Sequence, residues 1–260
     1  MTAVFDTADS RCVDRIVVSP NIEPRVGGRR PDLLLLHYTG MENAAKAIDW
    51  LSRPESKVSC HYVVAEDGAV TQMVPEALRA WHAGLSHWAG ETDINSRSIG
   101  IELAHPGHEY GYRAFAGAQI AALIDLSHGI LARNPIPPQR VLAHSDIAPE
   151  RKEDPGELFP WDALHAAGIG HWVPAEPIVV GPVLEQGDRG EGVRDLQYRF
   201  RQYGYAIEEE SEFGLGTKAV VVAFQRHFRP QRFDGIADVS TLATLDRLIA
   251  TLPGGPAASA

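Results

Sequence analysis

Two histidines and one aspartate stand where short apolar segments give way to polar loops. His37 follows the apolar run 33–36, His144 follows the run 141–143, and Asp154 lies further along the second loop. Two imidazoles and a carboxylate leave one position of a tetrahedral zinc site open, which is typical of catalytic rather than structural zinc. Because the chain holds eleven histidines, spacing alone identifies these three side chains only as candidate ligands.

The elements that must position these residues alternate between strands and helices. Residues 33–38 form a short apolar run, typical of a strand buried on both faces. Two apolar runs within 61–74, separated by an Asp-Gly turn, predict a hairpin of antiparallel strands, and alternation within 98–104 places Glu102 opposite the apolar side of another strand. The pattern also predicts helices at 44–51 and 115–131 and a strand at 141–144 that delivers His144 to a loop. We therefore expect an α/β fold with a mixed central sheet flanked by helices.

A proline-rich stretch divides the chain. It contains three prolines, lacks helical periodicity and predicts an extended linker. Beyond it, three short helical patterns predict a small three-helix domain. The expected organisation is a first domain at 1–172, a linker at 173–183, a helical domain at 184–250 and a flexible tail at 251–260.

The composition bounds the partners and the compartment. A net charge of -10 and a pI near 5.5 argue against nucleic acid or an anionic membrane surface as a partner, since both select for basic patches. The longest apolar run, 33–36, is far shorter than the roughly 20 residues of a membrane helix. The first twenty residues carry Asp6 and Asp9 and no signal-peptide core, so we expect a cytoplasmic protein with no membrane partner.

Five ordered segments resemble the N-acetylmuramoyl-L-alanine amidases, the AmpD-like zinc amidases related to peptidoglycan recognition proteins. They are LLLLHYTG, KVSCHYVVAEDGAVTQMV, RAWHAG, SIGIELAHPG and AHSDIAPERKEDPG. The resemblance runs from about residue 14 to about residue 172, and five ordered motifs are more specific than any single one. It implies the amidase-like fold, Zn²⁺ held by His37, His144 and Asp154, and hydrolysis of the amide between the lactyl group of N-acetylmuramic acid and L-alanine.

The same resemblance implies two catalytic residues. Glu102 would be the general base that takes a proton from water, and Lys152 the cation that stabilises the tetrahedral oxyanion. Without the surrounding motifs, both would be taken as solvent-facing charges. Some members carry a tyrosine just before the His61 position and no glutamate at the Glu102 position. Here Cys60 and Glu102 replace that pairing, which implies the glutamate-based mechanism.

Five further residues lie in or near these motifs, and the resemblance makes them candidates for contact with the peptide or the sugar. Ordinary packing is the alternative for each of them. They are His61, Trp81, His82, Asn95 and Arg97.

The region beyond the linker resembles the three-helix peptidoglycan-binding domain often fused to cell-wall hydrolases. The recognisable segments are LEQGDRGEGVRDLQYRFRQYGY, EFGLGTKAVVVAFQRHF and DGIADVSTLATL. Their apolar positions are accounted for by a helical core, so they do not by themselves show ligand binding. A structural role, bracing the catalytic domain or forming a homodimer, therefore stands beside wall binding.

Several functional interpretations remain. A cytoplasmic amidase would recycle soluble 1,6-anhydro-muropeptides, whereas an exported, periplasmic one would act on polymeric peptidoglycan. Peptidoglycan receptors on this fold have lost a zinc ligand, but here all three ligand positions and both catalytic positions are filled. A zinc peptidase shares the metal chemistry, but the chain lacks an HExxH helix. The sequence favours the recycling amidase, with peptidoglycan fragments as its partner.

Overall fold

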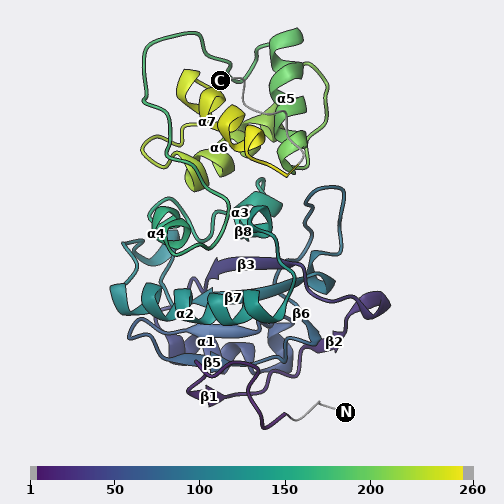
Figure 1. Cartoon of the computed structure of the whole chain (residues 1–260), viewed down its shortest axis with the longest axis vertical. Helices are drawn as coiled ribbons and strands as arrows, with labels where there is room; N and C mark the ends of the chain where they lie inside the picture. Colours follow the sequence, from purple (N-terminus) through teal and green to yellow (C-terminus); the bar gives the residue numbers. More distant parts are fainter. Residues whose placement is uncertain (1–4, 254–260) are drawn as a thin grey trace.

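The computed structural model describes residues 5–253, and its centre is a six-stranded sheet in the order β1-β5-β4-β7-β3-β8 (Figure 1). All neighbouring strands are parallel except β4 and β5, while β2 and β6 form a separate antiparallel pair. The strands are β1 (Arg15–Ile16), β2 (Ile22–Pro24), β3 (Leu33–Tyr38), β4 (Tyr62–Val64), β5 (Val70–Gln72), β6 (Leu78–Ala80), β7 (Ser98–Leu103) and β8 (Val141–Ala143).

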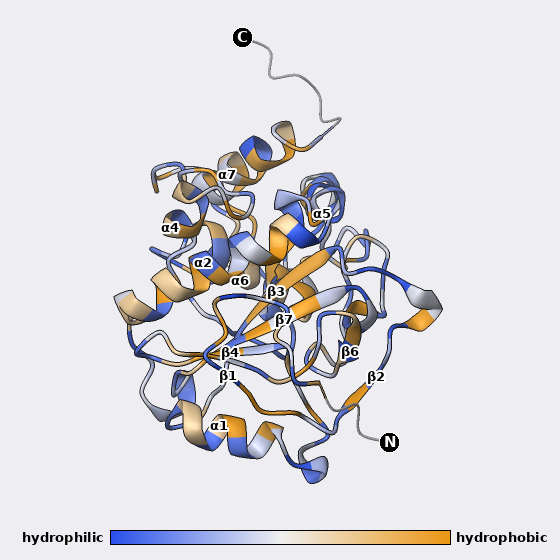
Figure 2. Ribbon diagram, turned by 60° about the horizontal axis from the view of Figure 1, so that its bottom comes forward, coloured by the Kyte–Doolittle hydropathy of each residue, from blue (hydrophilic) through white to orange (hydrophobic). Residues whose placement is uncertain are grey.

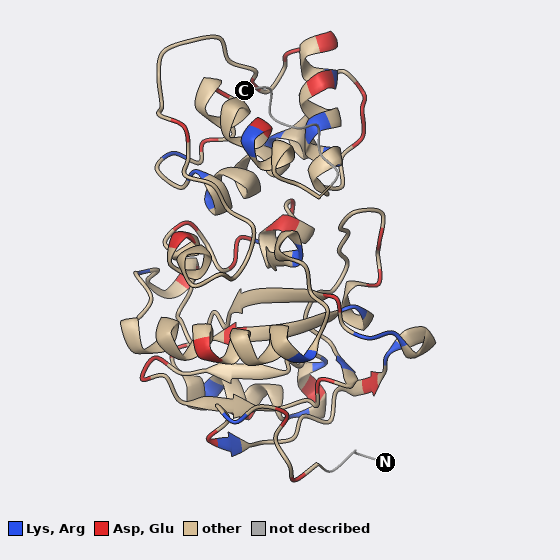
Figure 3. Ribbon diagram, in the orientation of Figure 1, with Lys and Arg blue, Asp and Glu red and all other residues tan. Residues whose placement is uncertain are grey.

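The helices fall into two groups. α1 (Ala44–Leu51), α2 (Gly117–Arg133), α3 (His144–Ile147) and α4 (Trp161–Ala166) belong with the sheet, and we call this part the sheet region. α5 (Glu191–Tyr203), α6 (Leu215–Phe228) and α7 (Val239–Ala250) form the helical unit at the top of Figure 1. Charged residues of both signs are interspersed over both parts (Figure 3). No helix within residues 5–253 is long and apolar enough to cross a membrane.

Most predicted elements are present, and the predicted α/β class with a mixed central sheet is confirmed. β3 and α1 coincide with the predicted segments 33–38 and 44–51, and β4 and β5 pair as the predicted hairpin. The prediction for His144 is wrong in detail, because this residue opens the one-turn helix α3 directly after β8 instead of entering a loop. Of the predicted tail at 251–260, residues 254–260 lie outside the described part of the chain.

One face of the sheet is covered by α2. Leu34 and Leu36 of β3 lie in register with Ile99 and Ile101 of β7, and all four belong to the hydrophobic cluster that contains the inner side of α2. The central strands are accordingly mostly orange in the hydropathy colouring of Figure 2. Because side chains alternate along a strand, the intervening residues of β3 and β7 point to the opposite face.

That opposite face, called the active face below, carries both apolar and polar side chains. Leu33 and Leu35 of β3 belong to a second hydrophobic cluster, and His37 follows them with the same alternation. His37 lies in register with Glu102, which in turn lies in register with Val63 of β4. Val63 packs against α1. α1 therefore covers the active face over β4, and His37 and Glu102 lie side by side on that face next to the part that α1 covers.

The helical unit completes the core over the rest of the active face. Leu33 and Leu35 share one hydrophobic cluster with residues of α5 and α6. The Trp88 ring packs edge-on against Tyr205, with 5.0 Å between ring centroids. Gly204 makes this approach possible, since a Cβ there would lie 2.6 Å from the Trp88 ring. The sheet region and the helical unit are thus joined by a shared core.

The predicted linker contains no helix or strand, but it is fastened in place. Val173 is buried in the shared core. The backbone N–H of Glu176 donates to the Thr244 hydroxyl at 3.0 Å, and the Ser240 hydroxyl donates to the Glu176 carbonyl. The segment 173–183 therefore begins as a strap along α7, whereas the proline pattern predicted an extended connection between separate domains.

Candidate metal centre and active site

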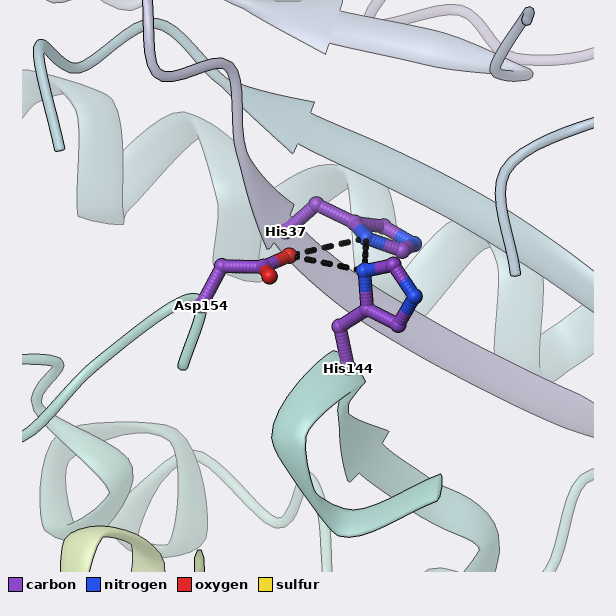
Figure 4. A group of neighbouring side chains, drawn as sticks. All are labelled: His37, His144 and Asp154. Atoms are coloured by element: carbon purple, nitrogen blue, oxygen red, sulfur yellow. Dashed lines mark hydrogen bonds and ion pairs between the residues drawn. The ribbon is translucent and has the colours of Figure 1, made fainter. Parts of the chain in front are cut away.

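Three side chains converge at one end of β3. His37 is the fifth residue of β3, and His144 opens α3 directly after β8, the parallel neighbour of β3. The following loop returns to α3, because the Ser145 N–H donates to the Asp154 carbonyl at 3.0 Å. Nδ1 of His37, Nδ1 of His144 and Oδ2 of Asp154 each lie 3.0 Å from the other two (Figure 4). The structure thus brings the three predicted ligands together, and all three are buried.

Hydrogen bonding determines which nitrogen of His144 faces this cluster. Nε2 lies 3.1 Å from the carbonyl oxygen of Ala83, which can only accept. Nε2 therefore carries the proton of the neutral ring, and Nδ1 presents its lone pair toward His37 and Asp154. The Arg151 guanidinium donates to the same Ala83 carbonyl.

A longer chain of hydrogen bonds orients His37. The Ser98 hydroxyl donates to the Ile94 carbonyl at 2.8 Å, so its oxygen accepts from Nε2 of His82 at 3.1 Å. Nδ1 of His82 is then an acceptor, and it lies 3.0 Å from Nε2 of His37. His37 therefore donates through Nε2 and also presents the lone pair of Nδ1 to the cluster.

The electrostatics of the cluster suit a cation. Burial, followed by the neighbouring His144, lowers the pKa of His37 to about 4, so its ring is neutral at pH 7. Two lone pairs and a carboxylate oxygen at mutual distances of 3.0 Å repel one another unless a positive charge lies among them. These residues can therefore hold a metal ion.

The loop 81–84 is the common support of both histidines. It supplies the His82 ring to His37 and the Ala83 carbonyl to His144. Asn95 fixes this loop, since its Oδ1 accepts from the backbone N–H of His82 at 3.0 Å and of Ala83 at 2.8 Å. Gly100 leaves room for it, because a Cβ there would lie 2.5 Å from Nδ1 of His82.

A cleft of about 410 Å³ opens beside the three ligands, between α1 and the loop that carries Asp154. Both predicted catalytic residues, Glu102 and Lys152, line it. Burial, and then the charge of Asp154, raises the pKa of Glu102 well above its usual value, while Lys152 opposes the rise. Oε2 of Glu102 is buried without a hydrogen-bond partner among the described residues. A cation at the three ligands would favour the ionised carboxylate, which is the form a general base needs.

The five predicted substrate-contact residues separate into two groups. Trp81 and His82 line the cleft, although the His82 ring is already engaged by His37. His61, Asn95 and Arg97 lie outside the cleft, and each makes side-chain hydrogen bonds or ion pairs within the protein. Their placement supports structural roles, the alternative to substrate contact.

Arg97 is used at the start of β3. Its guanidinium pairs with Asp32 and with Glu91, and its carbonyl accepts from the backbone N–H of Leu33 at 3.0 Å. The ion pair with Asp32 raises the pKa of Arg97, so this residue stays charged. Arg97 therefore holds the beginning of the strand that carries the candidate ligand His37 near its other end.

Acid is expected to destabilise the protein through His61. Its Nδ1 accepts from the Gly100 N–H at 3.0 Å, its Nε2 lies 3.1 Å from the Leu78 carbonyl, and the cation of Arg25 lies beside it. Burial, and then Arg25, lowers the pKa of His61 to about 3. An imidazole in the unfolded chain has a pKa of about 6.5, so below that pH the unfolded state binds a proton that the folded state does not. The stability that the buried neutral His61 contributes is therefore complete above pH 6.5 and is lost as the pH falls toward 3.

Urea unfolding of the metal-free protein at several pH values between 7.5 and 4.5 should show a falling free energy of unfolding, to which His61 contributes together with other buried histidines of lowered pKa such as His37. NMR titration assigns it, since the His61 ring signal should not shift over that range while the protein stays folded. A His61 ring that titrates near pH 6.5 would contradict the expected burial of a neutral imidazole.

Two groups that orient the candidate ligands are absent from the predicted site residues. The Ser98 hydroxyl orients His37 through His82, and the Ala83 carbonyl orients His144. The alternation of β7 contained a signal for Ser98, because it places this residue on the same face as Glu102. For the Ala83 carbonyl no side-chain pattern could give a signal.

Known proteins match this chain over both of its parts. The family described as N-acetylmuramoyl-L-alanine amidase matches residues 27–157, and the family described as putative peptidoglycan binding domain matches residues 189–245. The N-acetylmuramoyl-L-alanine amidase AmiD of Escherichia coli is 37% identical over 232 residues, which cover 85% of this chain and 83% of AmiD. The 1,6-anhydro-N-acetylmuramyl-L-alanine amidase AmpD of Enterobacter cloacae is 32% identical over 169 residues, which cover 58% of this chain and 88% of AmpD.

Solved structures agree with these relationships. E. coli AmiD, in a complex with the substrate anhydro-N-acetylmuramic acid-L-Ala-D-gamma-Glu-L-Lys, superposes with a TM-score of 0.74 at 34% identity, covering 88% of this chain and 93% of that one. AmpDh3 of Pseudomonas aeruginosa, in a complex with anhydromuramic pentapeptide, gives a TM-score of 0.72 at 31% identity, covering 89% of this chain and 96% of AmpDh3. With its cluster of two histidines and an aspartate beside a glutamate-lined cleft, the chain belongs to the N-acetylmuramoyl-L-alanine amidase family.

Proposed function

We propose that this amidase uses a zinc ion to hydrolyse the lactyl-L-alanine amide of soluble 1,6-anhydro-muropeptides. Two nitrogens and one carboxylate oxygen in a buried cluster suit tetrahedral zinc with one open position, which supports the choice of metal. The bound anhydromuramyl peptides of the AmiD and AmpDh3 structures support the choice of substrate.

The residues of the cleft divide the chemistry among them. His37, His144 and Asp154 would hold the ion, which supplies Lewis acidity to the scissile carbonyl and to water. Glu102 takes a proton from the attacking water as the water oxygen bonds to the carbonyl carbon. It then gives that proton to the leaving nitrogen of L-alanine as the C–N bond breaks. Lys152 places an ammonium where negative charge develops on the carbonyl oxygen.

One observation carries this proposal. The lone pairs of both histidines are directed at Asp154 by hydrogen bonds on the far side of each ring, and Glu102 is the register neighbour of His37 on the same face. A protein that only binds peptidoglycan would need neither the oriented ligands nor a carboxyl group with an unpartnered buried oxygen beside them.

Mass analysis of the products from a defined anhydro-muropeptide tests the proposal. We expect a free peptide that begins with L-alanine and an anhydro-sugar that keeps its lactyl group, with activity lost on chelation and restored by zinc. A receptor would return the intact muropeptide, and a peptidase would return a shortened peptide still attached to the sugar. Either product pattern would contradict the proposed activity.

Recycling of fragments in the cytoplasm is part of this proposal. The competing assignment is a periplasmic enzyme acting on polymeric wall, which the match of residues 189–245 to a peptidoglycan-binding family supports. We expect soluble fragments to be hydrolysed at least as fast as intact sacculi. A strong preference for sacculi, together with recovery of the protein from the periplasmic fraction, would favour the competing assignment.

A further inference from the structure

A buried carboxylate of the sheet region is held by side chains of the helical unit. Asp146, in α3, is 1% exposed and accepts three hydrogen bonds. The backbone N–H of Ala143 donates at 2.8 Å, the Tyr205 hydroxyl at 2.7 Å, and Nδ1 of His227 at 2.7 Å. We call Asp146, Tyr205 and His227 the latch.

Aromatic packing holds the two donors of the latch in place. The His227 ring is stacked between Trp161 and Phe228, with ring centroids 3.7 and 3.8 Å away. Tyr205 packs against Trp88 and is 1% exposed. The latch is therefore a buried contact in the interior of the protein, unlike an ion pair at the rim of an interface.

The latch acts on the segment that carries a metal ligand. Asp146 lies two residues after His144, and its Oδ2 accepts from Ala143, the residue just before His144. The N–H of Ser145, between them, donates to the carbonyl of Asp154 at 3.0 Å. Both the backbone that carries His144 and the loop that carries Asp154 are therefore fixed relative to Asp146.

α3 cannot hold this position by itself. It has only four residues, and a single helical turn is unstable without tertiary contacts because its nucleation cost exceeds what its few hydrogen bonds return. Among the described residues, Tyr205 and His227 supply the side-chain hydrogen bonds that reach α3 from outside the sheet region.

We propose that Tyr205 and His227 are positioning residues of the metal centre. They hold Asp146, and through it they keep His144 where its Nδ1 shares an ion with His37 and Asp154. The helical unit thereby takes part in forming the metal site, a role distinct from binding peptidoglycan. This inference rests on the proposed function only in taking these three residues as the zinc ligands.

Zinc affinity of the full-length chain tests the latch without reference to any substrate. Tyr205→Phe and His227→Phe each remove one donor to Asp146 and keep an aromatic ring for packing. Competition between the metal-free protein and a chromophoric chelator, titrated with zinc ions, measures the dissociation constant. We expect each variant to bind zinc about 10-fold more weakly, the lower end of the effect of groups that orient metal ligands indirectly.

Tyr203→Phe is the matched control. The Tyr203 hydroxyl is bonded to Nδ1 of His171 at 2.9 Å, and its ring packs against Trp88 beside that of Tyr205. This variant removes the hydroxyl of another buried tyrosine of the same shared core and leaves the three hydrogen bonds to Asp146 in place. We expect its free energy of unfolding to fall, although less than that of Tyr205→Phe, because a hydrogen bond to an imidazole contributes less than one to a carboxylate. Its zinc affinity should stay within about twofold of the wild type.

The outcomes separate the latch from the proposed function. If Tyr205→Phe and His227→Phe bind zinc as tightly as Tyr203→Phe, the helical unit only stabilises the fold and the inference is wrong. It is also wrong if Tyr205→Phe weakens zinc binding equally in the presence and absence of Asp146→Asn, because the effect would not pass through Asp146. A wild-type protein that binds no zinc would reject the metal assignment itself, and the latch's role with it.

Discussion

Glu102→Gln is expected to lower the turnover number at least about 100-fold while zinc stays bound, because general-base catalysis contributes on that scale. Glutamine keeps the size of the side chain in the cleft but cannot accept the proton of the attacking water. Since Glu102 is not one of the three residues whose ligand atoms face one another in the cluster, the metal content should stay stoichiometric. Steady-state kinetics on an anhydro-muropeptide, together with metal analysis of the same preparation, measures both quantities.

Glu150→Gln is the control for this variant. Glu150 is an exposed carboxylate four residues before Asp154, outside the cleft. The same chemical change there should leave turnover within about twofold of the wild type, as expected for a surface substitution. Near-normal turnover of Glu102→Gln would move the base role to another group in the cleft.

His37→Ala is expected to abolish stoichiometric zinc binding and, with it, measurable activity. Loss of one of three protein ligands leaves only two donors on the ion. It also removes the donor to Nδ1 of His82, one of the two partners of that ring, which loosens the support of His144 through the loop 81–84. Metal analysis after dialysis, and activity with and without added zinc, give the result.

His128→Ala makes the same substitution at an exposed histidine of α2, which covers the other face of the sheet. It should retain both metal and activity. A folded His37→Ala protein that kept full zinc content and full turnover would show that the catalytic ion lies elsewhere.

The parts of the site that could be predicted are those encoded locally. The apolar run before His37 reveals a buried strand that ends in a polar residue, and the alternation of β7 places Glu102 opposite Ile99 and Ile101. The resemblance to amidases then associates these residues with His144. Such short-range patterns identify which side chains face the site, because the periodicity of a strand fixes direction independently of the rest of the fold.

The remaining parts depend on contacts between distant segments. The bond from His144 to the Ala83 carbonyl spans 61 residues and involves a backbone atom, which residue type does not reveal. Helical spacing likewise identifies Phe200 as a core residue of α5, but a hydrophobic stripe does not name its partner. The structure shows that Phe200 shares its core with Leu33 and Leu35, so two segments predicted as separate domains complete one interior.

The fastened start of the linker, residues 173–176, has a consequence for how the cleft meets a substrate. A catalytic domain on a flexible linker samples many positions around the binding domain to which it is joined, so that it can reach many nearby bonds. Here Val173 is packed in the shared core and Glu176 is hydrogen-bonded to α7. The cleft therefore keeps one distance and one orientation relative to the helical unit. A small fragment can diffuse into such a cleft in any orientation that fits it. A strand fixed in a polymer must instead suit both parts of the molecule at once, because the cleft cannot turn relative to the helical unit.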